Sequence, residues 1–191
     1  MEPNYHLLRR GVHIIGLQLT LIYYLIPSTL FFSPLDKNYA MLVSLICVFE
    51  FEYIRVTRGW EIPGIRPYER YRFSAVLWSA IGLFICYVMC PYFIGIPVVV
   101  ATAWVDPLMG ELRRNNFKFV PEIGFVVYFL IFLSFLSYLS NLSMINILFI
   151  SLVAAVVGIL CETQKNYYLD DNFLLLTFPA IAAMCLITFM F

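Results

Sequence analysis

Charged residues are scarce in this chain. Only 13% of its 191 residues are Asp, Glu, Lys or Arg, whereas 62% are apolar and the mean hydropathy is +0.87. An ordinary soluble domain carries about 25% charged residues, so this composition excludes a soluble enzyme of the usual kind. Lipid has to solvate most of the surface, and the length suits one membrane domain, residues 1–191, rather than two.

The sequence also lacks the motifs of soluble nucleotide-binding folds. It contains no GxxxxGK[ST] loop and no GxGxxG after a strand, so any nucleotide has to bind on the loops of the membrane domain. The five cysteines lie in or beside apolar segments, with no His or carboxylate at a metal-ligand spacing, which favours packing over a zinc site or a disulfide framework. No nucleic-acid partner is expected.

Apolar windows of about 17–22 residues match a hydrocarbon core about 30 Å thick. Seven windows near this length predict an all-α, polytopic membrane bundle of about seven transmembrane helices. The fourth is short and contains Gly95 and Pro97, which leaves a broken or re-entrant segment as an alternative. The predicted windows are Gly11–Phe32, Ala40–Ile54, Phe73–Met89, Tyr92–Val105, Ile123–Leu139, Ile145–Leu160 and Asn172–Phe191.

The basic residues distinguish between these alternatives. With seven spans, the N-terminus and the segments 55–72, 106–118 and 162–171 share one side and hold eleven of the twelve Lys and Arg residues. Only Lys37 lies on the other side. Without the fourth span the split becomes seven to five. The positive-inside rule therefore favours seven spans, with the N-terminus and these loops in the cytosol.

Polar side chains at the cytosolic ends of the first two windows are candidate functional groups. Arg9 and His13 share a helix face, and snorkelling explains the arginines but not a histidine inside the apolar start of a span. Glu50 and Glu52 enter the last turn of the second window. Glu52 is able to pair with Arg55 as a helix-end ion pair, whereas Glu50 has no such local partner, so a structural and a functional interpretation both stay open.

Two polar loops have alternative interpretations. The segment 55–72 holds five arginines among Gly, Pro and aromatic residues. It fits either a contact with anionic lipid headgroups or an anion site, because arginine forks onto phosphate oxygens. Asp106-Pro107 is typical of a cap and first residue of a short cytosolic helix. The later Lys118 and Glu122 are plausible interfacial residues.

Asp170-Asp171-Asn172, at the start of the last window, is the strongest local signal. One Asp suffices to cap a helix, and two adjacent carboxylates repel each other unless a cation or a basic cluster holds them. Oxygen ligands of this kind suit Mg²⁺, which shares its coordination shell with substrate phosphates. The segment therefore predicts a magnesium site.

Together these motifs resemble the membrane family of dolichol kinase, phytol kinase and CTP-dependent diacylglycerol kinase. The resemblance follows the order of the chain over its whole length, although the glycine that the family has directly after its Lys and Glu is displaced here to Gly124. The matching segments are Arg9-Arg10-x-x-His13, Glu52-x-x-Arg55, Asp106-Pro107-x-x-Gly110, Lys118 with Glu122, and Asp170-Asp171-Asn172 with Pro179.

The resemblance implies an enzyme that transfers the γ-phosphate of a nucleotide, typically CTP, with Mg²⁺ to the hydroxyl of a long-chain lipid alcohol. Dolichol or another polyprenol, phytol, geranylgeraniol and diacylglycerol fit equally well. It implies catalytic roles for Asp170, Asp171, Asp106 and His13, and Mg²⁺ ligation by the three aspartates. Nucleotide or phosphate binding falls to Arg9, Arg10, Arg55, Arg66, Arg70, Lys118 and Asn172, with support from Glu50, Glu52, Gly110 and Glu122.

Three other functions are possible. A CDP-lipid synthase also uses CTP and Mg²⁺ but releases pyrophosphate. A small transporter is able to relay ions through Glu50, Glu52 and His13, although transporter sites lie near the bilayer midplane and these acids crowd the cytosolic ends. A non-catalytic scaffold leaves the paired aspartates unexplained.

Overall fold

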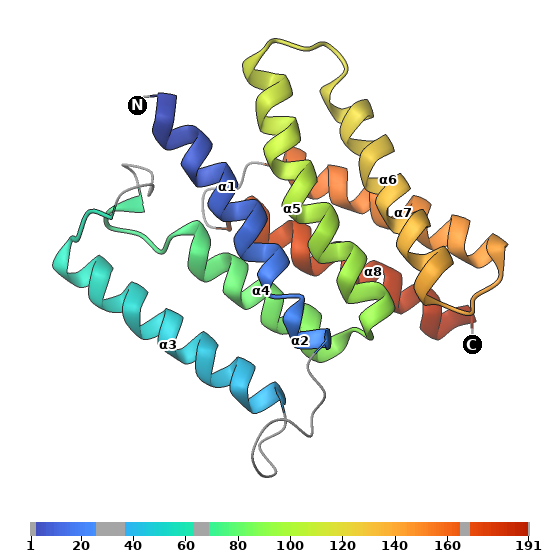
Figure 1. The fold of residues 1–191 in the computed structure, drawn as a ribbon, viewed down its shortest axis with the longest axis horizontal. Coiled ribbons are helices and arrows are strands. Elements are labelled where there is room, and N and C mark those ends of the chain that lie inside the picture. The colour runs from blue at the N-terminus through green and yellow to red at the C-terminus, as the bar shows by residue number, and fades with distance from the viewer. Residues whose placement is uncertain (1–2, 26–36, 63–68, 165–168, 191) are drawn as a thin grey trace.

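The computed structural model describes residues 3–25, 37–62, 69–164 and 169–190, and every regular element in these ranges is a helix (Figure 1). The all-α prediction is thus confirmed for the part of the chain described. The helices are α1 (Pro3–Leu19), the single turn α2 (Ile22–Leu25), α3 (Lys37–Arg58), α4 (Ala75–Met89), α5 (Tyr92–Arg114), α6 (Val120–Leu139), α7 (Met144–Thr163) and α8 (Asp171–Met190).

Four helices, α5 to α8, are long and apolar enough to cross a membrane. The apolar α4 has only 15 residues, α1 has 17, and α3 has charged residues at both of its ends. The described residues therefore form an all-helical chain of membrane type, in which four helices are able to cross a membrane by their length and composition. Seven spans remain a prediction that depends on α1, α3 and α4.

Helix α5 differs from one interpretation of the sequence. It runs without interruption from Tyr92 to Arg114, through Gly95, Pro97 and Pro107. The prediction that a new helix starts at Asp106-Pro107 is therefore wrong, because Asp106 lies inside a long helix. A proline within a helix removes one backbone hydrogen bond, and in membrane helices the neighbouring helices offset that loss.

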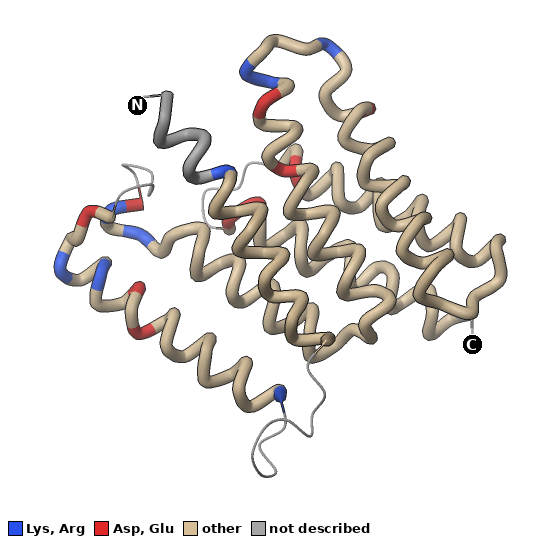
Figure 2. The backbone as a smooth tube through the Cα atoms, viewed as in Figure 1, with Lys and Arg blue, Asp and Glu red and all other residues tan. Residues whose placement is uncertain are grey.

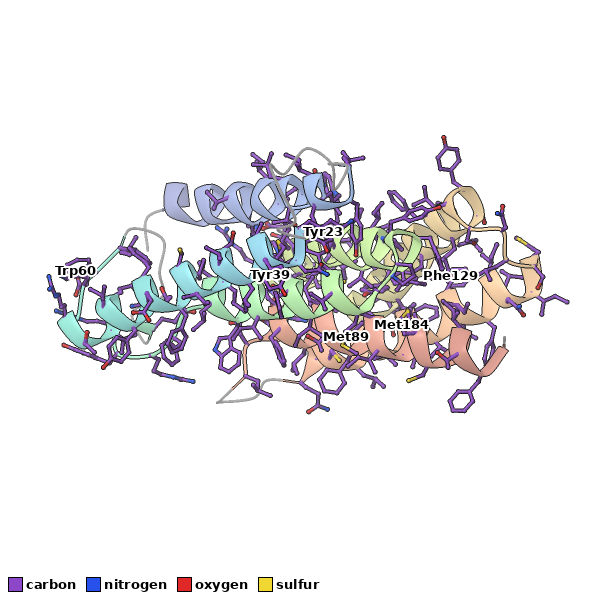
Figure 3. All side chains as sticks on the ribbon, turned by 90° about the horizontal axis from the view of Figure 1, so that it is seen from below. Tyr23, Tyr39, Trp60, Met89, Phe129 and Met184 are labelled. Atoms are coloured by element: carbon purple, nitrogen blue, oxygen red, sulfur yellow. The ribbon has the colours of Figure 1, made fainter. Side chains whose placement is uncertain are left out.

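The core of the bundle consists of α5, α6, α7 and α8, in which each helix packs on the next and α8 returns against α5. Helix α4 packs on α8, α3 packs on α4, and α1 packs on α5 (Figure 1). In the view turned by 90°, α1 and α8 lie on opposite faces with α4 and α5 between them (Figure 3).

Two glycines permit close approaches between neighbouring helices. A Cβ on Gly82 of α4 would lie 3.0 Å from Cβ of Leu176 on α8, and one on Gly158 of α7 would lie 2.8 Å from the Tyr128 ring on α6. Small residues at such points let helices pack closely where lipid supplies no hydrophobic driving force. Gly82 thus allows α4 to pack closely on α8, and Gly158 allows α7 to pack closely on α6.

Charged residues gather toward one side of the molecule (Figure 2). They lie on α1, at the C-terminal ends of α3, α5 and α7, and at the N-terminal ends of α6 and α8. The α6–α7 turn and the C-terminal part of α8 carry none, and Lys37 lies apart at the start of α3 (Figure 2). The polar ends of several helices thus meet in space.

Candidate functional site

Helices α5 and α8 place two of the predicted acids level with each other. Thr102 Oγ1 on α5 donates a hydrogen bond to the Leu175 carbonyl oxygen on α8 at 3.3 Å, and both residues are fully buried. Asp106 lies one turn after Thr102, and Asp171 lies one turn before Leu175. Because the two helices run in opposite directions (Figure 1), both acids lie ~6 Å beyond this contact toward the same end of the bundle.

Helix α1 brings two more predicted residues to this end. His13 Nε2 lies 3.7 Å from Asp106 Oδ2. One turn away, Arg10 donates a hydrogen bond to the Glu111 carboxylate, and its guanidinium lies beside Gly110. These polar contacts hold α1 against the half of α5 that carries the acids. The structure therefore joins the predicted basic segment of the first helix to the predicted Asp-containing segment.

The first turn of α8 is a compact polar cluster. The backbone N–H of Asn172 donates to Asp170 Oδ1 at 3.0 Å and to Asp171 Oδ1 at 3.1 Å. The Asn172 side chain is buried, with 4% exposure for the residue, and its Oδ1 meets no hydrogen-bond donor in the part of the chain described. Buried polar atoms in native proteins are almost always satisfied, so an acceptor in this state is a candidate ligand contact.

One ion pair at this end was missed by sequence reasoning. Arg113, near the end of α5, donates to Glu162 on α7, whose side chain is only 1% exposed. The pair adds α7 to the helices that meet here. A signal was present in the sequence, because Glu162 is a lone acid directly after an apolar window, and acids at such positions are often functional.

Arg55 has a different role from the one predicted. Its guanidinium is fully buried, and each of its N–H groups has an acceptor in Glu52 or in the backbone carbonyls of Glu69, Arg70 and Arg72. No donor remains for a phosphate. The prediction of phosphate binding by Arg55 is therefore wrong in this structure, whereas Glu52 does order its surroundings.

The remaining predicted residues are more exposed or lie outside the described part. The Arg9 side chain and Arg66 fall outside it. Arg70 is 44% exposed at its side chain and pairs with Glu61 at 2.5 Å. Three further predicted residues are exposed to solvent and lie outside the cluster around Asp106. They are Glu50 on α3, Lys118 in the α5–α6 connection and Glu122 in the first turn of α6.

The three predicted metal ligands do not form a ready-made metal centre. Among the residues described, no three His, Cys, Asp or Glu side chains come together as ligands for one ion. Mg²⁺ in phosphoryl-transfer sites typically takes one or two carboxylates and completes its shell with water and substrate phosphates. Asp106, Asp171 and the Asn172 amide oxygen, at one end of α5 and α8, supply the oxygen chemistry for such a partial site.

Comparison with known proteins gives no relative, because no family model, curated protein or solved structure matches this chain. The candidate site therefore stands on its own residues. It combines carboxylates and an amide oxygen that suit a hard cation, basic side chains that suit phosphate, and apolar helices that suit a lipid.

Proposed function

We propose that this protein is a membrane kinase that phosphorylates a long-chain lipid alcohol, with CTP as the expected donor and Mg²⁺ as the cofactor. The observation that carries the proposal is the level placement of Asp106 on α5 and Asp171 on α8, because the Thr102–Leu175 hydrogen bond sets their relative height. His13 lies beside Asp106, and Arg10 and the Arg113–Glu162 pair lie further toward the same end of α5. Phosphoryl transfer depends mainly on positioning and charge neutralisation, which such a set supplies.

The chemistry assigns distinct tasks to the residues. Mg²⁺, when bound by aspartates at this end, would neutralise the phosphate oxygens. Arg10, Arg70 and Lys118, with Arg9 and Arg66 outside the described part, are proposed to bind the phosphates as cations. The alcohol oxygen bonds to the γ-phosphorus as the bond to the β–γ bridging oxygen breaks, and an aspartate carboxylate accepts the hydroxyl proton.

The bundle itself accounts for the lipid substrate. Exposed apolar side chains cover α5 to α8, so an isoprenoid or acyl chain lies along the helices while its hydroxyl reaches their polar ends. The excess of basic residues at those ends favours a cytosolic orientation for the N-terminus and the site, which gives the enzyme access to nucleotide.

The test is phosphate transfer in lipid. Purified protein in nanodiscs is incubated with Mg²⁺ and γ-phosphate-labelled CTP or ATP, with dolichol, a shorter polyprenol, phytol, geranylgeraniol or diacylglycerol as acceptor. We expect label in one extractable lipid, with CTP preferred. A folded preparation that binds nucleotide but labels no lipid would contradict the kinase and favour the CDP-lipid synthase. A preparation that binds no nucleotide would favour the transporter.

A further inference from the structure

We infer that Glu52 and Arg55 form a positioning clamp that fixes the loop of residues 69–74 level with the first turn of α8, so that Arg70 and Arg72 present their charges to the phosphates of the nucleotide. This inference rests on the proposed function for the identity of the ligand. It goes beyond that function by giving the buried ion pair a task in substrate binding, although neither residue of the pair touches the substrate.

The arginine side of the clamp holds the loop by its backbone. Arg55 Nη1 donates to the carbonyl oxygens of Glu69 at 3.0 Å and Arg70 at 3.3 Å, and Nη2 donates to that of Arg72 at 2.5 Å. Three carbonyls within four consecutive residues thus converge on one guanidinium. The rigid fork of arginine donors matches this arrangement, and the three donors of a lysine ammonium do not.

The carboxylate side of the clamp reaches the start of α4. Glu52 accepts two hydrogen bonds from Arg55, both at 2.9 Å, and its Oε2 accepts the backbone N–H of Ser74 at 2.8 Å. Ser74 in turn caps α4, because its side chain accepts from Val76 N–H. The clamp therefore fixes both the loop and the first turn of the helix that follows.

The packing of α4 on α8 sets the height of the loop of residues 69–74 relative to the candidate site. Trp78 packs on Phe173 with ring centroids 5.7 Å apart, and Gly82 lies against Leu176, so α4 and α8 run in the same direction at matching heights. Counting back one turn from Trp78 reaches Ser74, and counting back from Phe173 reaches Asp170. The loop thus ends at the level of the acidic cluster of α8.

Burial distinguishes the clamp from an ordinary helix-end ion pair. The side chains of Arg55 and Glu52 are 0% and 2% exposed, whereas surface pairs at this spacing are solvated and contribute little. A buried ion pair is retained at low cost only when its remaining donors and acceptors are satisfied, and here the loop backbone satisfies them. Of the two loop arginines, Arg70 lies at the surface with its side chain 44% exposed and paired with the exposed Glu61, and Arg72 is half-buried.

The experiment measures loop order and nucleotide binding separately on the full chain in nanodiscs. Hydrogen exchange is followed for residues 69–74, and CTP affinity is measured by equilibrium dialysis with Mg²⁺. For Arg55→Lys we expect exchange in the loop to rise about tenfold and CTP affinity to fall about tenfold, while exchange in α5 to α8 is unchanged. The control is Arg58→Lys, an exposed arginine at the same helix end that lies over the Trp60 ring, which leaves both quantities as in wild type.

Each outcome decides the inference. Unchanged loop exchange overturns the clamp, and faster exchange with unchanged CTP affinity overturns its role in phosphate binding. A wild-type protein that binds no CTP also overturns it. If wild type binds CTP but phosphorylates no alcohol, the kinase proposal fails while the clamp stands on exchange and binding. Should Arg55→Lys not fold, Glu52→Gln provides the same two readouts with the same expected directions.

Discussion

Asp171 is the residue whose chemistry is easiest to separate from its structural role. Its Oδ1 accepts the Asn172 N–H, and an asparagine at the same position retains an oxygen for that bond. Asp171→Asn therefore removes a negative charge and a proton acceptor but keeps an acceptor for the Asn172 N–H, and Asp170 still accepts from the same N–H. We expect alcohol kinase activity to fall about a hundredfold or more, with normal membrane insertion and purification.

Activity of this variant is measured with the lipid acceptor that wild type prefers, beside Asn141→Ala as a control in the exposed α6–α7 turn. Preserved turnover in Asp171→Asn would rule out its assignment as a catalytic or metal-binding acid.

Arg113 is predicted to contribute more to the stability of the protein than the adjacent Arg114. Its partner Glu162 is almost fully buried, whereas Arg113 is 39% exposed, so removing the arginine weakens the compensation of a buried charge. We expect Arg113→Ala to lower the unfolding free energy by about 1–3 kcal/mol, a range reduced because the arginine is partly solvated. Arg114→Ala, at an exposed neighbouring position, is the matched control.

Thermal unfolding in detergent compares the two variants. Equal melting temperatures for Arg113→Ala and Arg114→Ala would show that the Glu162 contact contributes nothing measurable.

The sequence predicted the position of single residues where a polar side chain at the start of an apolar segment would be energetically costly without a partner. His13 inside an apolar start and the Asp170-Asp171-Asn172 segment both lie at the polar end of the bundle. The role of Arg55 was not predictable, because its acceptors are backbone carbonyls fourteen to seventeen residues away, and a sequence pattern does not show where those carbonyls point.

At the scale of the helix, the contact between α4 and α8 leads to a direct prediction. Gly82 is buried, and its missing side chain leaves room for Leu176 and the Phe173 backbone. Gly82→Val forces α4 away from the first two turns of α8. We expect a loss of about 1–3 kcal/mol in stability and reduced activity, because the acidic turn of α8 shifts with the contact.

Gly16→Ala is the control for this variant, since no atom lies within 4 Å of a Cβ at Gly16 and alanine favours a helix. Melting temperature and turnover are measured for both. A Gly82→Val protein as stable and active as wild type would contradict the role given to this contact.

The helices themselves were largely predictable, because long apolar windows have few alternatives in lipid. The windows for α6, α7 and α8 agree with the structure to within a few residues. The predicted window for α5 ended at Val105, whereas the helix continues to Arg114. The end was misplaced because Asp106-Pro107 is a sequence typical of a helix start, and tertiary packing continues the helix through it. No local pattern reveals that continuation.

At the scale of the whole molecule, the clustering of charge predicts the topology. In a cysteine-free background, single cysteines replace Glu61, Asn116 and Asn141, which are exposed in three separate connections. An impermeant maleimide applied to sealed vesicles should label positions 61 and 116 from the same side and position 141 from the other. This pattern requires an even number of crossings between 61 and 116, assigned to α4 and α5, and an odd number between 116 and 141, assigned to α6.

Permeabilised vesicles, in which all three cysteines react, serve as the control. Labelling of positions 61 and 116 from opposite sides would remove one of the crossings assigned to α4 and α5, and with it the seven-span topology.

The central claim is that a γ-phosphate moves from nucleotide to a lipid alcohol, and the position of the label in the donor tests it most directly. Wild-type protein in nanodiscs is given Mg²⁺, the alcohol mixture and CTP labelled at either the α- or the γ-phosphate, and the extracted lipid is counted. The account predicts that only γ-labelled CTP yields labelled lipid. Label from α-labelled CTP, or from neither donor, would contradict it.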